Sequence, residues 1–196
     1  MPALIASPAP EPAPAGGRAG ATADPGASAL DGCLESLELA CLGAGLPAAA
    51  EHELQQASRC YADPMAVERH LLRAVDLAPQ HPATLIGLYR FYFYRNRLVE
   101  ALQVGERCLA NAARVNGLPA AWQMVRPEQA DFGGFSAVPR LYLFSLQACA
   151  YLCLRLGALE RGGALLDKLV ELDPGDRVHG SVLRGVLQRW GQDDDE

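Results

Sequence analysis

Hydrophobic residues recur at three- and four-residue steps along most of the chain, with polar residues between them. This spacing places the hydrophobic side chains on one face of an α-helix. It is clear at Val67 and Leu71, ahead of Pro79, and appears again ahead of Pro174. Residues 28–192 are therefore predicted to form an all-α domain.

The stretch GLYRFYFYRNRLVEAL, residues 87–102, is the part of the chain that is densest in aromatic residues. As a β-strand it would put aromatic residues and arginines on both faces, so that neither face would be apolar. As a helix it places Leu88 and Tyr92 on one stripe, and Asn96 then falls where a turn would lead into a second helix. We therefore predict two helices joined by a turn.

A run of apolar, acidic, Leu, any residue and Pro closes a helical pattern twice, in VDLAPQHP and in VELDPGDR. Proline just after a helix is a stop signal, because it has no amide hydrogen and restricts the residue before it. Another amphipathic pattern follows each run. The sequence therefore contains a repeated helix-turn-helix unit.

These units resemble the tetratricopeptide (TPR) family, whose repeats span about 34 residues and form two antiparallel helices. The resemblance implies an α-solenoid of about three such units, starting near residue 48 and closed by a helix over residues 177–190. The matching residues are Leu85, Leu88, Tyr92, Asn96 and Ala101 in the second unit, and Leu146, Cys149, Ala150, Gly157 and Leu166 in the third.

Three segments fall outside the repeats. Residues 1–27 are mainly Ala, Pro, Gly and Ser, which bury too little surface to offset the entropy of ordering, and are predicted to be disordered. The Gly, Pro and aromatic residues near 114–140 predict an ordered loop inserted between the second and third units. Residues 193–196 form an acidic tail. Ahead of the first unit, a helical stripe is predicted at Leu30, Cys33, Leu34, Leu37 and Cys41.

In the TPR family the first helix of each repeat lines a concave groove that binds a ligand. The resemblance thus implies a partner-binding groove formed by Ile86, Arg90, Phe93, Tyr94, Phe144, Gln147, Tyr151 and Arg155. Aromatic side chains offer contact area at low entropy, and arginine can hold a carboxylate through two hydrogen bonds. The alternative is that the aromatic side chains pack on a neighbouring helix or on the inserted loop and bind nothing.

The formal net charge of -6 argues against a general binder of nucleic acid or of anionic membranes, because attraction to phosphate needs an excess of Lys and Arg. The first residues, MPALIASPAP, show neither the basic region nor the apolar run of a secretory signal. The sequence also suggests no stretch near the ~20 apolar residues of a membrane-spanning helix. A cytoplasmic protein that binds a protein or peptide partner is therefore expected.

No set of residues specifies a reaction, so neither enzymatic activity nor a cofactor is expected. The DFGG at residues 131–134 lacks the other motifs of a kinase. Cys149 and Cys153 lie one helical turn apart and coincide with the core positions of the repeat, which favours packing over chemistry. A metal- or redox-handling accessory protein that uses its cysteines is the alternative.

Three stretches are also similar to small TPR proteins that accompany nitrogen-fixation machinery in proteobacteria: LYRFYFYRNRLVEAL, DFGGFSAVPRLYLFSLQ and LVELDPGDRVHGSVL. The similarity covers roughly residues 28–190. It implies that the partner is a nitrogenase component or an assembly factor. An accessory or assembly factor for a metalloenzyme such as nitrogenase is therefore a further expectation.

Overall fold

The computed structural model describes residues 45–60 and 62–193, without the side chains of residues 186 and 188–193. The described residues form seven α-helices and no strand, which confirms the all-α prediction. The predictions of a disordered N-terminus, of a helical stripe at residues 30–41 and of an acidic tail lie outside the described residues, except that the last helix reaches Asp193.

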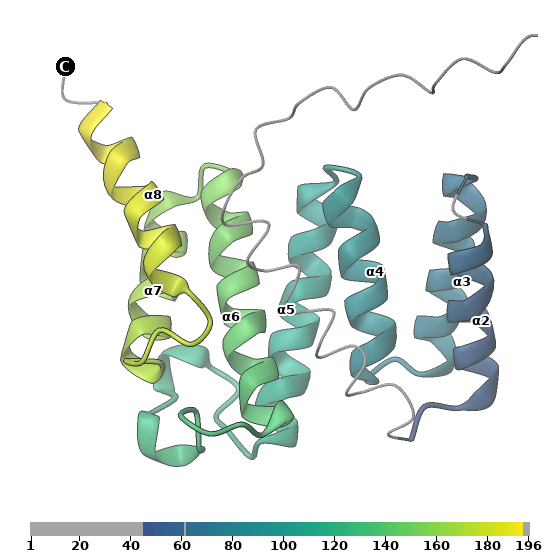
Figure 1. The fold of residues 1–196 in the computed structure, drawn as a ribbon, viewed down its shortest axis with the longest axis horizontal. Coiled ribbons are helices and arrows are strands. Elements are labelled where there is room, and N and C mark those ends of the chain that lie inside the picture. The colour runs from purple at the N-terminus through teal and green to yellow at the C-terminus, as the bar shows by residue number, and fades with distance from the viewer. Residues whose placement is uncertain (1–44, 61, 194–196) are drawn as a thin grey trace, which may run out of the picture.

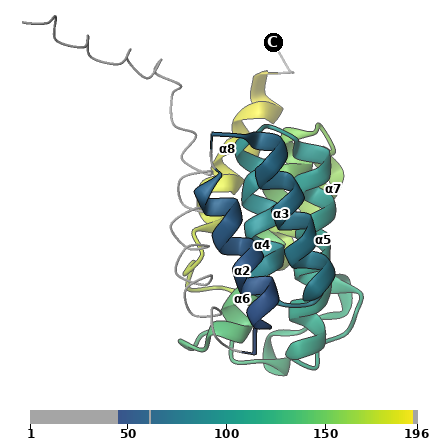
Figure 2. The ribbon, with the colours of Figure 1, turned by 90° about the vertical axis from the view of Figure 1, so that its right-hand side faces the viewer.

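The helices lie side by side in chain order and form a row (Figure 1). Each helix packs against the next one along the chain, and α2 also touches α4, as α6 touches α8. Seen along the row, α2, α4, α6 and α8 lie on one side and α3, α5 and α7 on the other (Figure 2). The helices are α2 (Ala48–Arg59), α3 (Pro64–Leu77), α4 (Pro82–Tyr94), α5 (Leu98–Val115), α6 (Ala137–Arg155), α7 (Leu159–Leu172) and α8 (Gly180–Asp193).

The first two turns of the row are set by local capping. The Asp63 side chain accepts hydrogen bonds from the backbone N–H groups of Met65 and Ala66, at 3.0 and 3.2 Å, and so caps α3. Proline stands at the first position of both α3 and α4, where no amide hydrogen is needed. Helix α3 ends just before Pro79, as the stop pattern predicts.

The predicted pair of helices in residues 87–102 is confirmed. Helix α4 ends at Tyr94, α5 begins at Leu98, and Asn96 makes the turn with a φ of 56°. Asparagine is one of the few residues that tolerate this left-handed conformation. Helix α5 then ends before Asn116 and Gly117, whose φ of 68° favours glycine.

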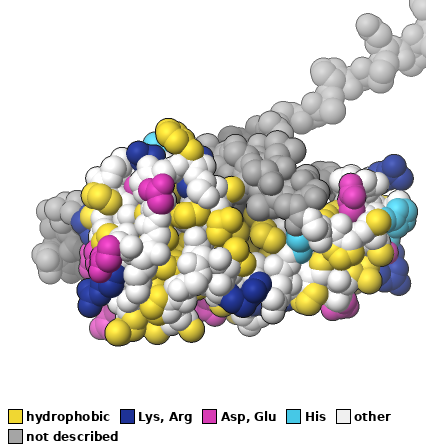
Figure 3. Space-filling view, turned by 90° about the horizontal axis from the view of Figure 1, so that it is seen from below, with side chains coloured by type: hydrophobic (Ala, Val, Ile, Leu, Met, Phe, Trp, Pro, Cys, Tyr) yellow, Lys and Arg dark blue, Asp and Glu magenta, His cyan; other side chains and the backbone are white. Residues whose placement is uncertain are grey.

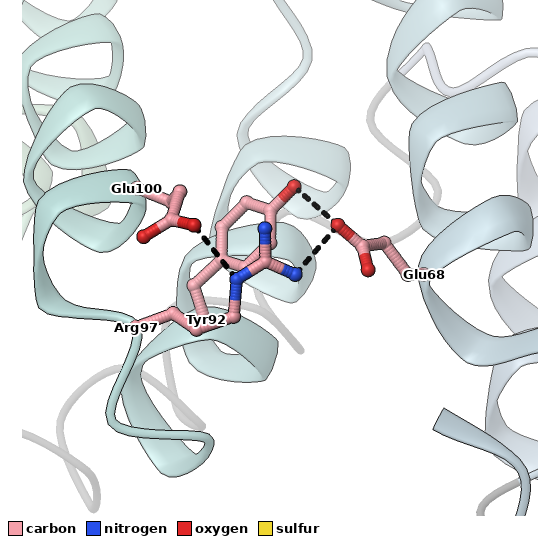
Figure 4. A network of polar contacts seen from close by, with 4 residues as sticks. All are labelled: Glu68, Tyr92, Arg97 and Glu100. Carbon is pink, nitrogen blue, oxygen red and sulfur yellow. Dashed lines mark hydrogen bonds and ion pairs between the residues drawn. The ribbon is translucent and has the colours of Figure 1, made fainter. Parts of the chain in front are cut away.

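The joint between α3, α4 and α5 is held by a polar network around Glu68 (Figure 4). The Glu68 carboxylate accepts hydrogen bonds from the hydroxyl of Tyr92 at 3.0 Å and from the guanidinium of Arg97 at 2.8 Å. Arg97 also donates to Glu100 at 2.8 Å and lies over the Tyr92 ring, 4.5 Å from its centroid. The four side chains therefore connect the first pair of helices to the second.

Helix α6 is the centre of the core. Every residue from Leu141 to Leu154 is buried, because α5 and α7 pack against it along its length and α8 adds a third neighbour. Among the described residues this helix is long and apolar enough to cross a membrane by length and composition, but 83% of that window is buried inside the protein. Packing within the row therefore accounts for its apolar character.

The segment between α5 and α6, where the insertion is predicted, contains two short 3-10 helices, Trp122–Met124 and Pro127–Gln129. Val125 and Phe132 bury their side chains against the rest of the core. The ammonium group of Lys168, on α7, is buried and donates to the Val125 carbonyl at 3.1 Å. This lysine, the single one in the chain, therefore fastens the loop to α7.

Candidate functional site

A mainly apolar cavity of about 440 Å³ opens between α2, α3 and α4. We call it the α2–α4 groove. Its floor is close to Gly87, where an added Cβ would lie 3.4 Å from Leu71 and 3.5 Å from Leu54. Both distances are ordinary van der Waals contacts, so Leu54 and Leu71 pack closely over Gly87. The lining residues are Leu54, Ala57, Ser58, Val67, Leu71, Gly87, Arg90, Phe91, Tyr94 and Arg95.

Arginine and aromatic side chains form the rim of the groove on the α4 side. Tyr94 is 56% exposed, and the guanidinium of Arg90 lies 5.9 Å from the centre of its ring. Arg95 lies 5.6 Å from the ring centre of Phe91 in the same way. Such pairs offer a flat apolar surface next to a cation, which suits an apolar side chain flanked by a carboxylate.

Phe93 extends this surface from α4 to α6. Its ring centre lies 5.7 Å from the ring centres of Tyr89, Tyr94 and Tyr151. On α6, the guanidinium of Arg155 donates to the Tyr151 hydroxyl at 2.7 Å. The aromatic rings thus connect the rim of the α2–α4 groove to the exposed arginine at the end of α6.

The structure brings half of the predicted groove residues to the surface and buries the other half. Arg90, Phe93, Tyr94 and Arg155 lie together on the rim or next to it. The other four are buried, which corrects the prediction that their side chains line an open surface: Ile86, Phe144, Gln147 and Tyr151.

The contacts of Gln147 show why this part of α6 is covered and does not form an open groove. Its side-chain amide donates to the carbonyl of Val178, in the segment that joins α7 to α8. Asp173 accepts from the Val178 amide at 3.0 Å and so holds the same segment. This segment covers the part of α6 that the TPR resemblance assigns to an open groove.

Several lining residues were not predicted. Leu54, Ala57, Val67 and Leu71 belong to the first unit, and their apolar periodicity is equally typical of a closed core. Gly87 is different, because it holds a groove position of the TPR repeat and its small size was expected to leave room there.

Charge is distributed unevenly over the helices near the groove. Helices α4 and α6 contain no Asp or Glu, whereas they carry Arg90, Arg140 and Arg155, and Arg95 caps α4. The charged residues that line the groove itself are Arg90 and Arg95, in a chain whose net charge is negative.

The inserted loop lies away from this rim. Phe135, which is 89% exposed, stands just before the first residue of α6, whereas Arg155 is the last. A helix of 19 residues is about 28 Å long, so the two ends are far apart. From below, hydrophobic side chains reach the surface between charged ones along the row (Figure 3). The rim and the loop are therefore separate surfaces.

The described cysteines are placed for packing. Cys149 and Cys153 are buried, as their repeat positions predict. Burial raises the pKa of Cys108 to about 12 and that of Cys149 further, which disfavours the thiolate needed for metal binding or nucleophilic attack. Within residues 45–60 and 62–193, no three His, Cys, Asp or Glu side chains are grouped so that they could hold a metal ion.

Comparison with known proteins adds one relative. No protein-family model matches the sequence, and no solved structure matches it. An uncharacterized 19.8 kDa protein in the nifW 5' region of Azotobacter chroococcum mcd 1 is 38% identical over 122 residues, which span 61% of this chain and 68% of the relative. The chain therefore belongs to the same family as this protein from the nifW 5' region.

Proposed function

We propose that this protein is a non-enzymatic TPR-like adaptor of the cytoplasm, which binds a protein partner in the α2–α4 groove. Its helices pair in chain order, α2 with α3, α4 with α5 and α6 with α7, and alternate between two layers, which supports a repeat solenoid. The observation that carries the proposal is the groove itself: a mainly apolar cavity rimmed by arginine and exposed tyrosine.

The groove fits a peptide segment with apolar and acidic side chains. Apolar side chains can contact the apolar lining of the groove, which includes Leu54, Leu71 and Phe91. Arg90 and Arg95 stand on the rim and can hold carboxylates. An amphipathic helix with acidic residues beside its apolar stripe has this chemistry, and recognition of a helix in a groove is a common mode of peptide binding.

The test compares two matched double variants as baits in affinity capture followed by binding measurements. Arg90→Glu with Tyr94→Ala changes an arginine and the aromatic ring beside it on the rim. Arg177→Glu with Phe135→Ala changes a similar pair, 5.5 Å apart, at the inserted loop. Each variant should retain the helical content of the unchanged protein.

A partner that binds in the groove should lose about 2 kcal/mol or more, which is about thirty-fold in affinity, with the rim variant and little with the loop variant. The opposite pattern would move the binding surface to the inserted loop. Unchanged binding by both variants would contradict the proposal.

A second proposal is that the protein is an accessory or assembly factor in nitrogen fixation. It rests on the relative in the nifW 5' region, together with the three similar sequence stretches. Deleting the gene in its native host should slow growth on dinitrogen and leave growth on ammonium unchanged. Equal growth of the deletion and the parent on dinitrogen would argue against this role.

A further inference from the structure

The described chain begins near the N-terminal end of α4, one of the helices that line the α2–α4 groove. Gly45 lies close to the turn between α3 and α4, where it lines a small cavity with Pro47 and residues 78–81. His81 in this turn caps α4, because its ring nitrogen accepts a hydrogen bond from the Ala83 amide at 3.3 Å. Residues that precede Gly45 therefore start near the N-terminal end of α4.

The length of the preceding sequence matches the length of the groove wall. Helix α4 has 13 residues, which is about 20 Å. The predicted helical stripe over residues 30–41 would be about 18 Å long as a helix. Residues 42–44 provide a short connection that includes a glycine. Such a helix, running antiparallel to α4 from Gly45, would reach the level of Arg90 and Tyr94.

The chemistry of this segment is complementary to that of the groove. Five of its apolar residues fall on one helical face: Leu30, Cys33, Leu34, Leu37 and Cys41. Its charged residues are all acidic and fall on one flank of that face: Asp31, Glu35 and Glu38. The charged residues that line the groove, Arg90 and Arg95, are both arginines. The segment thus has the apolar and acidic character that the groove fits.

We propose that residues 28–44 of the same chain dock in the α2–α4 groove as an amphipathic helix. A short covalent connection gives the segment an effective concentration in the millimolar range, so even a weak complex is well populated. A partner of the same chemistry must displace it, so that the segment sets a threshold for binding. The docking itself requires no partner and stands apart from the proposed adaptor function.

The test is hydrogen exchange of the full chain, read by mass spectrometry. In the unchanged protein, amides of residues 34–44 should exchange at least about tenfold more slowly than in an unstructured peptide. The variant Leu34→Asp with Leu37→Asp places two charges on the apolar face, so the protection factor of residues 34–44, relative to an unstructured peptide, should fall to about one. Amides of α4 near Tyr94 should exchange faster in the same variant, because their cover is lost.

The matched control is Ser28→Asp with Ser36→Asp, which adds the same charge away from the apolar face and should keep the protection. On the other side of the contact, Arg90→Glu with Tyr94→Asp should release residues 34–44 as well. Exchange of residues 34–44 at the rate of an unstructured peptide in the unchanged protein would overturn the proposal. So would full protection in the Leu34→Asp and Leu37→Asp variant.

Two further measurements distinguish this segment from other occupants of the groove. Protection that rises with protein concentration, together with a dimer in light scattering, would assign the groove to a second copy and refute docking within one chain. Partner capture is measured separately: the Leu34→Asp and Leu37→Asp variant should bind a groove partner at least about tenfold more tightly, since a competing state is removed. Failure to capture any partner would affect the adaptor proposal and leave the exchange result standing.

Discussion

Replacing Gly162 with alanine should destabilise the protein relative to the same change at its neighbour Gly163. Both glycines lie on α7, but they face different surroundings. An added Cβ at Gly162 would lie 2.5 Å from Cδ2 and 2.8 Å from Cγ of Leu154, and 3.3 Å from the backbone oxygen of Ala150. At Gly163 the nearest atom would be Cδ2 of Leu187, at an ordinary 3.6 Å. Helices α6 and α7 therefore approach each other closely over Gly162.

The expected magnitudes follow from two opposing effects. Alanine is favoured over glycine in a helix by about 1 kcal/mol, and both variants gain this amount. Only Gly162→Ala adds a methyl group to a packed contact, which typically costs about 1–3 kcal/mol, and Leu154 is buried and has little room to move. We expect Gly163→Ala to stabilise the protein by up to about 1 kcal/mol and Gly162→Ala to be about 1–3 kcal/mol less stable than it.

Urea and thermal unfolding followed by circular dichroism measure this difference. For a chain of this size, about 1 kcal/mol corresponds to about 2–4 °C in Tm, so the two variants should differ by several degrees. An unchanged dependence on urea would show that both variants unfold in the same way as the parent protein. Equal stability of the two variants would refute the close approach of α6 and α7.

Four other changes test the core. Tyr89→Phe removes a buried hydroxyl that has no hydrogen-bond partner among the described residues, so it should stabilise the protein by up to about 1 kcal/mol. Tyr92→Phe loses the hydrogen bond to Glu68 and should destabilise the protein by about 0.5–1.5 kcal/mol in the same unfolding assay. Burial raises the pKa of Tyr142 from 10.0 to about 12, so between these pH values the folded state retains a proton that the unfolded state releases. The free energy of unfolding should therefore fall as the pH rises from about 10 to about 12, and it should fall less in Tyr142→Phe. Lys168→Met leaves the Val125 carbonyl of the inserted loop without its hydrogen-bond donor, which should cost about 1–3 kcal/mol of stability. Limited proteolysis of this variant should then begin in the inserted loop. Cleavage that begins elsewhere would contradict the role of Lys168 in holding the loop.

Much of the fold could be predicted because its elements begin and end at residues with strong local preferences. Asn96 and Gly117 adopt positive φ values at the ends of α4 and α5, and the prolines follow or open helices where the patterns place them. These preferences depend on a few neighbouring residues. The sequence alone therefore carries them.

Contacts between distant segments could not be predicted in the same way. Tyr89 stands where the TPR pattern usually has glycine, and the sequence offers no reason for it. In the structure an added Cβ at Gly105 would lie 3.8 Å from the Tyr89 ring and 3.4 Å from the sulfur of Cys149. A glycine on α5 therefore makes the room that the aromatic residue on α4 takes up.

The candidate site was predicted in part for a similar reason. Rim residues such as Arg90 and Tyr94 were identified because the repeat positions of α4 point toward the groove. Tyr151 holds on α6 the repeat position that Arg90 holds on α4, yet it is buried, and Gln147 one turn earlier is hydrogen-bonded to the segment from α7 to α8. The repeat pattern specifies the direction of a side chain. It does not specify what lies over it.

The single lysine has a practical consequence for anyone who labels this protein. Lys168 is 8% exposed and hydrogen-bonded to the inserted loop, so its amine is shielded from reagents. Amine-directed dyes, crosslinkers and acylating enzymes are left chiefly with the α-amino group. A fluorophore attached through that group would give a nearly uniform product without engineered cysteines, and it would leave the arginine chemistry of the surface intact.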